Sequence, residues 1–183
     1  MKLFILYFTT LILVLPSLSK GQIIIYPTSK SYLDTNSLVK KFKKIQLSGN
    51  YFKTIDLEGN KSKIQRDSIW GYLSENDKPY RMWGKRALHI DTSTKFITIY
   101  HDFQDEAVII GDVILSDSKK TFYFSSNLDN EIYPLYYENL KNVFNFTDAE
   151  LVNLKRLDKK RMISKKNPMT NNYYITETLF LNK

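Results

Sequence analysis

The sequence predicts an α+β protein, with an antiparallel, curved sheet of about six to nine strands and two helices near its C-terminal part. From Tyr51 to Ser125, short apolar runs alternate with polar residues at the period of two that is typical of half-buried strands. Clusters of Gly, Asn, Asp, Ser and Pro separate these runs and indicate hairpin turns. Beyond Pro134 the apolar spacing becomes helical, so sheet and helices are segregated along the chain.

Residues 1–21 have the layout of a secretory signal peptide. Lys2 precedes the charge-free apolar run Leu3–Leu15, and small residues follow it. The run is shorter than the roughly 20 residues that a membrane-spanning helix requires, so we expect cleavage after Ser19 or after Gly21 rather than a retained anchor. The protein is then secreted or periplasmic and not integral to a membrane, with residues 22–183 as one domain.

The composition excludes several kinds of chemistry. The chain has no cysteine, which rules out a lipid-modified cysteine, a disulfide framework, a thiol nucleophile and a zinc–thiolate site. Its formal net charge of +8 suits an anionic partner, although such a charge also simply keeps a protein soluble. We expect an anionic envelope glycan or a lipid headgroup as partner rather than nucleic acid.

The first elements after the leader are short. Ile23–Ile25 is either an edge strand or the tail of the leader. Between Asn36 and Leu47, the side chains of Leu38, Phe42 and Ile45 recur at helical spacing with lysines around them, which predicts a short amphipathic helix.

Three hairpins and two further strands are expected next. The run Ala107–Leu115 is apolar on both faces, so we expect it to be a central strand that is covered on both sides. Its partner is expected at Thr121–Ser125. The hairpins pair Tyr51–Asp56 with Lys61–Gln65, Ser68–Leu73 with Tyr80–Trp83, and Leu88–Asp91 with Phe96–His101.

The C-terminal part contains the clearest local signal. Thr147 followed by Glu150 forms a capping box, which predicts a helix that begins near Asp148. A shorter helix carrying Leu140 and Val143 is expected before it, after Pro134. The final run Tyr173–Leu181 alternates in polarity and is expected to return to the sheet as a strand.

Several of these segments resemble known sequences. The chain is similar to uncharacterised secreted proteins of Bacteroidota in the following stretches: Ser68–Tyr72, Tyr80–Arg81, Ile99–Tyr100, Thr121–Ser125 and Ile132–Leu135. The resemblance implies a bacterial source and export. It carries no catalytic residue, because the matching stretches are strand, turn and helix-entry sequences.

The only two histidines, His89 and His101, lie on the two arms of one expected hairpin. A four-residue loop over Thr92–Lys95 pairs position 89 with position 98 and leaves the imidazoles on opposite faces. A loop with one residue more or fewer places both on one face, about 7–8 Å apart, where they could hold a metal ion. Acids close enough in sequence to add oxygen ligands are Asp91, Asp102, Asp105 and Glu106.

Catalytic signatures are scarce. The chain has no Gly-x-Ser-x-Gly turn and no phosphate-cradling glycine loop, so we expect neither a serine hydrolase nor a nucleotide or other cofactor. Glu177 is the one candidate acid, because its expected strand face is otherwise apolar and burial would raise its pKa. A glycan hydrolase that uses Glu177 is therefore the alternative function, and it requires a second carboxylate nearby.

Two surfaces are candidates for ligand binding. The first is basic and lies on the helix expected to begin near Asp148, with Lys155, Arg156, Lys159 and Lys160, although these charges also complement the helix dipole. The second is aromatic, and it comprises Trp70, Tyr72, Tyr80 and Trp83 with Arg81 beside them, although such residues also pair across strands. The sequence therefore favours a secreted, non-enzymatic binding or envelope-associated protein.

Overall fold

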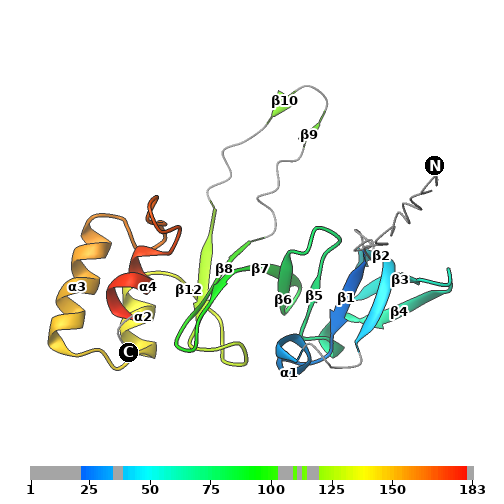
Figure 1. The fold of residues 1–183 in the computed structure, drawn as a ribbon, viewed down its shortest axis with the longest axis horizontal. Helices are drawn as coiled ribbons and strands as arrows, with labels where there is room; N and C mark the ends of the chain where they lie inside the picture. The colour runs from blue at the N-terminus through cyan, green and yellow to red at the C-terminus, as the bar shows by residue number, and fades with distance from the viewer. Residues whose placement is uncertain (1–21, 35–38, 103–108, 111–112, 115–119, 181–183) are drawn as a thin grey trace, which may run out of the picture.

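The structure is a computed structural model that describes residues 22–34, 39–102, 109–110, 113–114 and 120–180. The expected leader and its cleavage sites lie outside the described residues. The described chain forms an open antiparallel sheet, with the C-terminal helices gathered at one end of it (Figure 1). The α+β class is confirmed.

Ten strands form the main sheet in the order β12-β11-β8-β7-β6-β5-β1-β2-β3-β4, and every neighbouring pair is antiparallel. This is more than the expected six to nine strands, and the sheet is open and uncurled rather than curved. The strands are β1 (Ile23–Tyr26), β2 (Lys40–Ser48), β3 (Tyr51–Asp56), β4 (Lys61–Gln65), β5 (Gly71–Leu73), β6 (Pro79–Trp83), β7 (Arg86–Ser93), β8 (Thr98–Asp102), β11 (Phe122–Ser125) and β12 (Tyr133–Pro134).

The three expected hairpins are confirmed as β3–β4, β5–β6 and β7–β8. Strand β1 lies inside the sheet, because it pairs with β2 on one side and β5 on the other, so Ile23–Ile25 is neither an edge strand nor a leader tail. Gly71 allows β5 and β6 to come together, since a Cβ at this position would lie 2.2 Å from the carbonyl oxygen of Tyr80.

The expected helix between residues 36 and 47 is wrong, because Lys40–Ser48 is strand β2. The pairing shifts between Phe42 and Lys44, which makes Lys43 the extra residue of a β-bulge. The bulge turns both Phe42 and Ile45 toward the same apolar cluster, although they are three residues apart. A bulged strand therefore reproduces the spacing of a helix. Leu38 lies outside the described residues.

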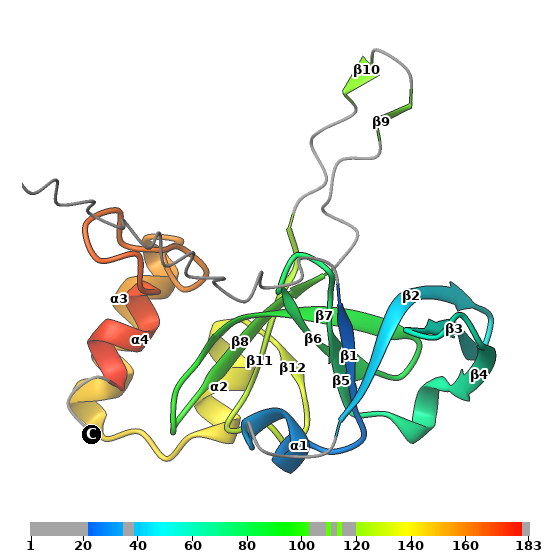
Figure 2. The ribbon, with the colours of Figure 1, turned by 45° about the vertical axis from the view of Figure 1, so that its right-hand side comes forward.

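The prediction of a central strand over Ala107–Leu115 is also wrong, as the described residues of this segment show. Ile109–Ile110 (β9) pairs with Val113–Ile114 (β10) in a separate two-stranded sheet. In Figure 2 this pair lies away from the ten-stranded sheet. The sequence holds a signal for this outcome, because Gly-Asp at positions 111 and 112 is a dipeptide typical of tight hairpins.

The described residues contain four α-helices: α1 (Ser29–Leu33), α2 (Tyr137–Val143), α3 (Asp148–Lys159) and α4 (Tyr174–Leu179), with a 3-10 turn at Arg66–Ser68. The two expected helices are α2 and α3, and the capping box at the start of α3 is present, with Oε2 of Glu150 accepting from the Thr147 amide at 2.7 Å. The expected last strand is wrong, because its residues from Tyr174 to Leu179 form α4. Leu181 lies outside the described residues.

The apolar side chains form three clusters on the two faces of the sheet. Helices α2, α3 and α4 cover the end of one face, where Ile97, Ile99 and Phe124 pack against Leu140, Leu154 and Ile175. A second cluster is centred on Phe52, Tyr72 and Tyr80 from β3, β5 and β6. The third lies under the loop after β11, where Leu128 and Ile132 pack on Leu88, Ile90 and Tyr100. No helix among the described residues is both long enough and apolar enough to cross a membrane.

Candidate functional site

The two histidines lie directly opposite each other on β7 and β8, and their ring centroids are 4.6 Å apart. The expected pairing of position 89 with position 98 is wrong, and the local geometry explains the error. The loop is Thr94–Ile97, so that Ser93 pairs with Thr98, and the pairing then shifts between Ile90 and Thr92. Asp91 is the extra residue of a β-bulge, and His89 faces His101 beyond it.

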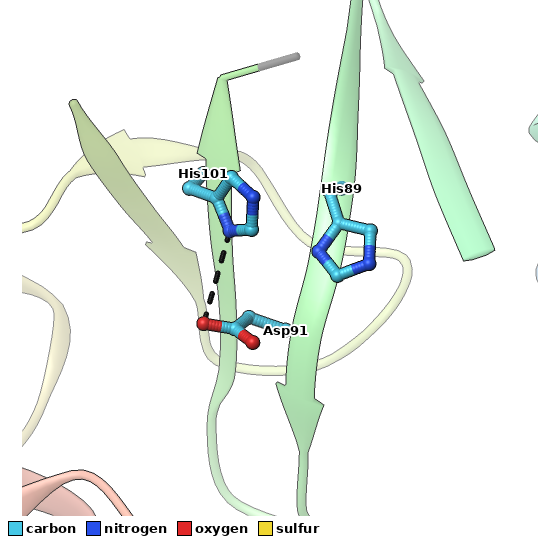
Figure 3. A group of neighbouring side chains, drawn as sticks. All are labelled: His89, Asp91 and His101. Atoms are coloured by element: carbon cyan, nitrogen blue, oxygen red, sulfur yellow. Dashed lines mark ion pairs between the residues drawn. The ribbon is translucent and has the colours of Figure 1, made fainter. Parts of the chain in front are cut away.

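This one-residue bulge creates the site. If the pairing near the loop continued unchanged, His89 would face Asp102, and the imidazoles would lie on opposite faces of the hairpin. The bulge changes the register by one residue and returns both imidazoles to one face, together with the Asp91 carboxylate. One donor atom from each of His89, Asp91 and His101 lies within 4.8 Å of the others (Figure 3).

The Asp91 carboxylate connects the sheet to the segment that joins α3 to α4. Its Oδ1 accepts from the Lys166 ammonium at 3.0 Å, its Oδ2 accepts from the Tyr173 hydroxyl, and the Nδ1 of His101 lies 3.7 Å from Oδ2. Lys166 and Tyr173 face each other in an isolated bridge, and the ammonium lies 5.2 Å from the centre of the Tyr173 ring. The sequence gives no sign of this contact, because the partners are 75 and 82 residues apart.

Charge and hydrogen bonding set the protonation of this cluster. Burial alone raises the pKa of Asp91, but the nearby His101 imidazole and the hydrogen bonds from Tyr173 and Lys166 outweigh it and hold that pKa well below its ordinary value. Burial, followed by the bond to Asp91, raises the pKa of the Tyr173 phenol. Asp91 is therefore a carboxylate and Tyr173 a neutral donor at neutral pH.

Asp102, another acid near the histidines in the sequence, does not join this cluster. Asp102 is opposite Leu88 and lies 3.6 Å from the guanidinium of Arg86. Asp105 and Glu106 lie outside the described residues.

The aromatic candidates are part of the core rather than of an exposed platform. Tyr72 and Tyr80 are cross-strand partners, both are buried, and their rings stack at 4.9 Å. Arg81 is also buried, and it donates to the Tyr100 hydroxyl and to a backbone carbonyl in the loop after β11. Trp70 and Trp83 are partly buried against the third cluster.

Glu177 is a partly exposed residue of α4, so the expectation of a buried acid on a strand is wrong. Its carboxylate accepts hydrogen bonds from the Thr170 hydroxyl and from Nδ2 of Asn167 at 2.9 Å. These bonds lower its pKa, whereas the general acid of a glycan hydrolase needs a raised one. Glu177 therefore fixes the turn before α4 and does not supply such an acid.

The basic candidates Lys155, Arg156 and Lys159 are exposed on one side of α3, and Lys160 is the exposed residue that caps its C-terminal end. A second basic surface, which no local sequence pattern indicates, lies on β2, β3 and β4. We call it the lysine face, and it consists of Lys44, Lys53, Lys61 and Lys63. The sequence alone does not show that these lysines share one face of the sheet, because this depends on how the three strands pair.

Strand register places the four lysines of the lysine face together. Lys53 is directly opposite Lys63, while Lys44 and Lys61 flank Ile55 on its two sides. All four ammonium groups are exposed, and they line an open hollow of about 680 Å³. Within the described part of the chain, no carboxylate lies within ion-pair distance of any of them.

Comparison of the chain with protein-family models, with curated proteins and with solved structures gives no match. The function must therefore be argued from the lysine face and the histidine cluster themselves.

Proposed function

We propose that the protein is a secreted, non-enzymatic binding protein whose lysine face takes an acidic polysaccharide of the cell envelope. The observation that carries the proposal is the direct opposition of Lys53 and Lys63 in a group of four exposed lysines. Like charges directly opposite one another destabilise a sheet, and no described acid offsets them. A polyanion would remove this repulsion.

The shape of the lysine face favours a linear polymer. Lys61 and Lys63 are two residues apart on β4, so their side chains leave the strand about 6.8 Å apart. Lys53 and Lys44 extend the same row of charges onto β3 and β2. An exposed ion pair contributes only about 0.2–1 kcal/mol, so a small anion would bind weakly. A chain of carboxylates or sulfates can occupy several lysines at once and gains by avidity.

The proposal fits the predicted export of the protein, since acidic glycans are found outside the cytoplasm. We favour binding over glycan hydrolysis, because the pKa of Glu177, the candidate catalytic acid, is lowered, whereas a general acid needs a raised pKa. The proposal requires that the polysaccharide binds to the lysine face and not to the other basic surface, on α3.

The test compares two double variants that lose the same charge. Lys53→Gln/Lys63→Gln removes the opposed pair, and Lys155→Gln/Lys159→Gln removes two exposed lysines from α3. Binding to immobilised polygalacturonate is measured at about 50 mM salt, with a neutral dextran as reference, because charge contacts weaken as salt rises. We expect at least a tenfold loss of affinity for the first variant and less than a twofold loss for the second.

Equal losses for the two variants would show that net charge alone determines binding and would contradict the proposal. Equal binding to dextran and polygalacturonate would contradict it as well. Vesicles that contain anionic lipid provide a third arm. Binding to these vesicles without binding to polygalacturonate would assign the lysine face to lipid headgroups instead of a glycan.

A further inference from the structure

We infer that His89, Asp91 and His101 form a binding site for a divalent transition metal ion, with Zn²⁺ as the representative member of that class. This site is separate from the lysine face and does not depend on the proposed function. The inference rests on the placement of two imidazoles and one carboxylate on one face of the β7–β8 hairpin (Figure 3).

The bulge at Asp91 brings the three donor side chains to one face of the hairpin. A regular hairpin would place the imidazoles on opposite faces, and one inserted residue brings them together. Bulges commonly re-aim side chains next to functional sites. Here the inserted residue is itself the carboxylate, so a single local irregularity supplies the third donor and aligns the other two.

One donor atom of the cluster is unsatisfied within the described part of the protein. The Nδ1 of His101 is buried, has no hydrogen-bond partner among the described residues and lies 3.7 Å from the Asp91 carboxylate. A buried nitrogen without a partner is costly, and a metal ion shared with the carboxylate would satisfy it. Donors of a tetrahedral zinc site lie about 3.4 Å apart, so the three side chains must close by roughly 1 Å from their present spacing.

The Asp91 carboxylate is held in place by a neighbouring side chain. Tyr173 donates to Oδ2, and an outer hydrogen bond of this kind orients a metal-binding carboxylate. The side chains of Asp91 and His101 are each 18% exposed, so an ion can reach the cluster from solvent. Two imidazoles and one carboxylate leave further coordination positions for water, and this ligand set suits Zn²⁺ or Fe²⁺ better than Ca²⁺ or Mg²⁺.

Lys166 is the competing cation. Its ammonium lies 3.0 Å from Oδ1 of Asp91, so a metal ion must share the carboxylate with it. A unit positive charge about 6 Å from a divalent ion in a water-like dielectric weakens binding about tenfold. The site therefore binds more tightly when this charge is removed, which a purely structural cluster does not predict.

The experiment titrates tag-free protein with Zn²⁺ by calorimetry, and with Co²⁺ while its visible absorption is recorded. Because the chain has only two histidines, an imidazole-bound Co²⁺ spectrum can come from no other pair. We expect one ion per chain, at least a tenfold loss of affinity for His89→Gln and for His101→Gln, and about a tenfold gain for Lys166→Met. Asp56→Asn, a change in an exposed turn carboxylate, is the control and should bind as the unaltered protein does.

The inference is overturned if the unaltered protein binds no ion at 100 μM Zn²⁺ or if the His89→Gln/His101→Gln double variant binds as well as the unaltered chain. Weaker binding by Lys166→Met than by the unaltered protein would also overturn it. Circular dichroism of each variant shows whether the fold is retained. The Lys166→Met variant keeps all three donors, so a gain in affinity cannot result from misfolding.

Discussion

The hydroxyl of Tyr173 ties the segment before α4 to the centre of the sheet, and Tyr173→Phe tests how much this contact stabilises the protein. The substitution removes one hydrogen bond to Asp91 and retains the ring, which packs edge-on to Phe122 at a centroid distance of 6.1 Å. A hydrogen bond to a charged group contributes about 1.5–3 kcal/mol. We therefore expect the free energy of unfolding to fall by about 2 kcal/mol, and the midpoint temperature to fall by about 4–8 °C.

The pH dependence of this loss follows from both groups. The pKa of Asp91 is lowered in the folded protein, so its contribution is present above the ordinary value of 3.8 and declines as the pH falls through the folded value. The pKa of Tyr173 is raised, so its contribution is present below the ordinary value of 10.0 and declines as the pH rises through the folded value. The difference between Tyr173→Phe and the unaltered protein should be largest between these limits.

The assay is urea unfolding with a metal chelator present, at several pH values between 3 and 10. Tyr174→Phe is the matched control, since this neighbouring tyrosine is partly exposed and should change the free energy of unfolding by less than about 0.5 kcal/mol. Equal effects of the two substitutions would refute the reasoning. A difference that grows on acidification would also refute it, because protonation of Asp91 must weaken the contact.

Three further changes test the fold, each by urea unfolding at neutral pH. Gly71→Ala should lower the free energy of unfolding by about 3 kcal/mol, because the new Cβ would lie 2.2 Å from a backbone carbonyl oxygen, and a loss below 1 kcal/mol would contradict the close approach of β5 and β6. Thr147→Ala should cost about 1 kcal/mol through the lost cap of α3, whereas Thr147→Ser should cost little. Trp70→Phe should cost about 1 kcal/mol, because it removes the 3.1 Å hydrogen bond to the Leu128 carbonyl, and an unchanged protein would show that this bond does not hold the loop.

Elements with strong local signals were predictable from the sequence. The hairpin β3–β4 has clear alternation and a turn between its strands, and α3 has a complete capping box. Each of these signals lies within a few residues of the structure that it specifies. Long-range pairing does not need to be known for either element.

The wrong predictions concern two segments, β2 and α4, whose apolar spacing fits both a helix and a strand. The bulge at Lys43 places Phe42 and Ile45 on one face and so gives a strand the spacing of a helix. In α4 the reverse holds, because Ile175 and Leu179 fit the alternation of a strand and also the four-residue spacing of a helix. Packing of α4 against α3 and the sheet favours the helix over the strand. This tertiary contact cannot be inferred from the local sequence.

The histidine cluster was predictable only in part. His89 and His101 stood out as the sole histidines, and Asp91 was near enough in sequence to be considered. Their common face depends on a bulge, whose position the alternation of the strand does not reveal. Lys166 and Tyr173 come from a distant segment, so only the tertiary structure brings them to Asp91.

The most direct test of the proposed function is a map of where an acidic oligosaccharide touches the protein. Amide chemical shifts are recorded by NMR while a short polygalacturonate is added. The account predicts changes concentrated on β2, β3 and β4 around Lys44, Lys53 and Lys63, with α3 unaffected. Changes confined to α3, or a spectrum that does not change at all at low salt, would contradict it.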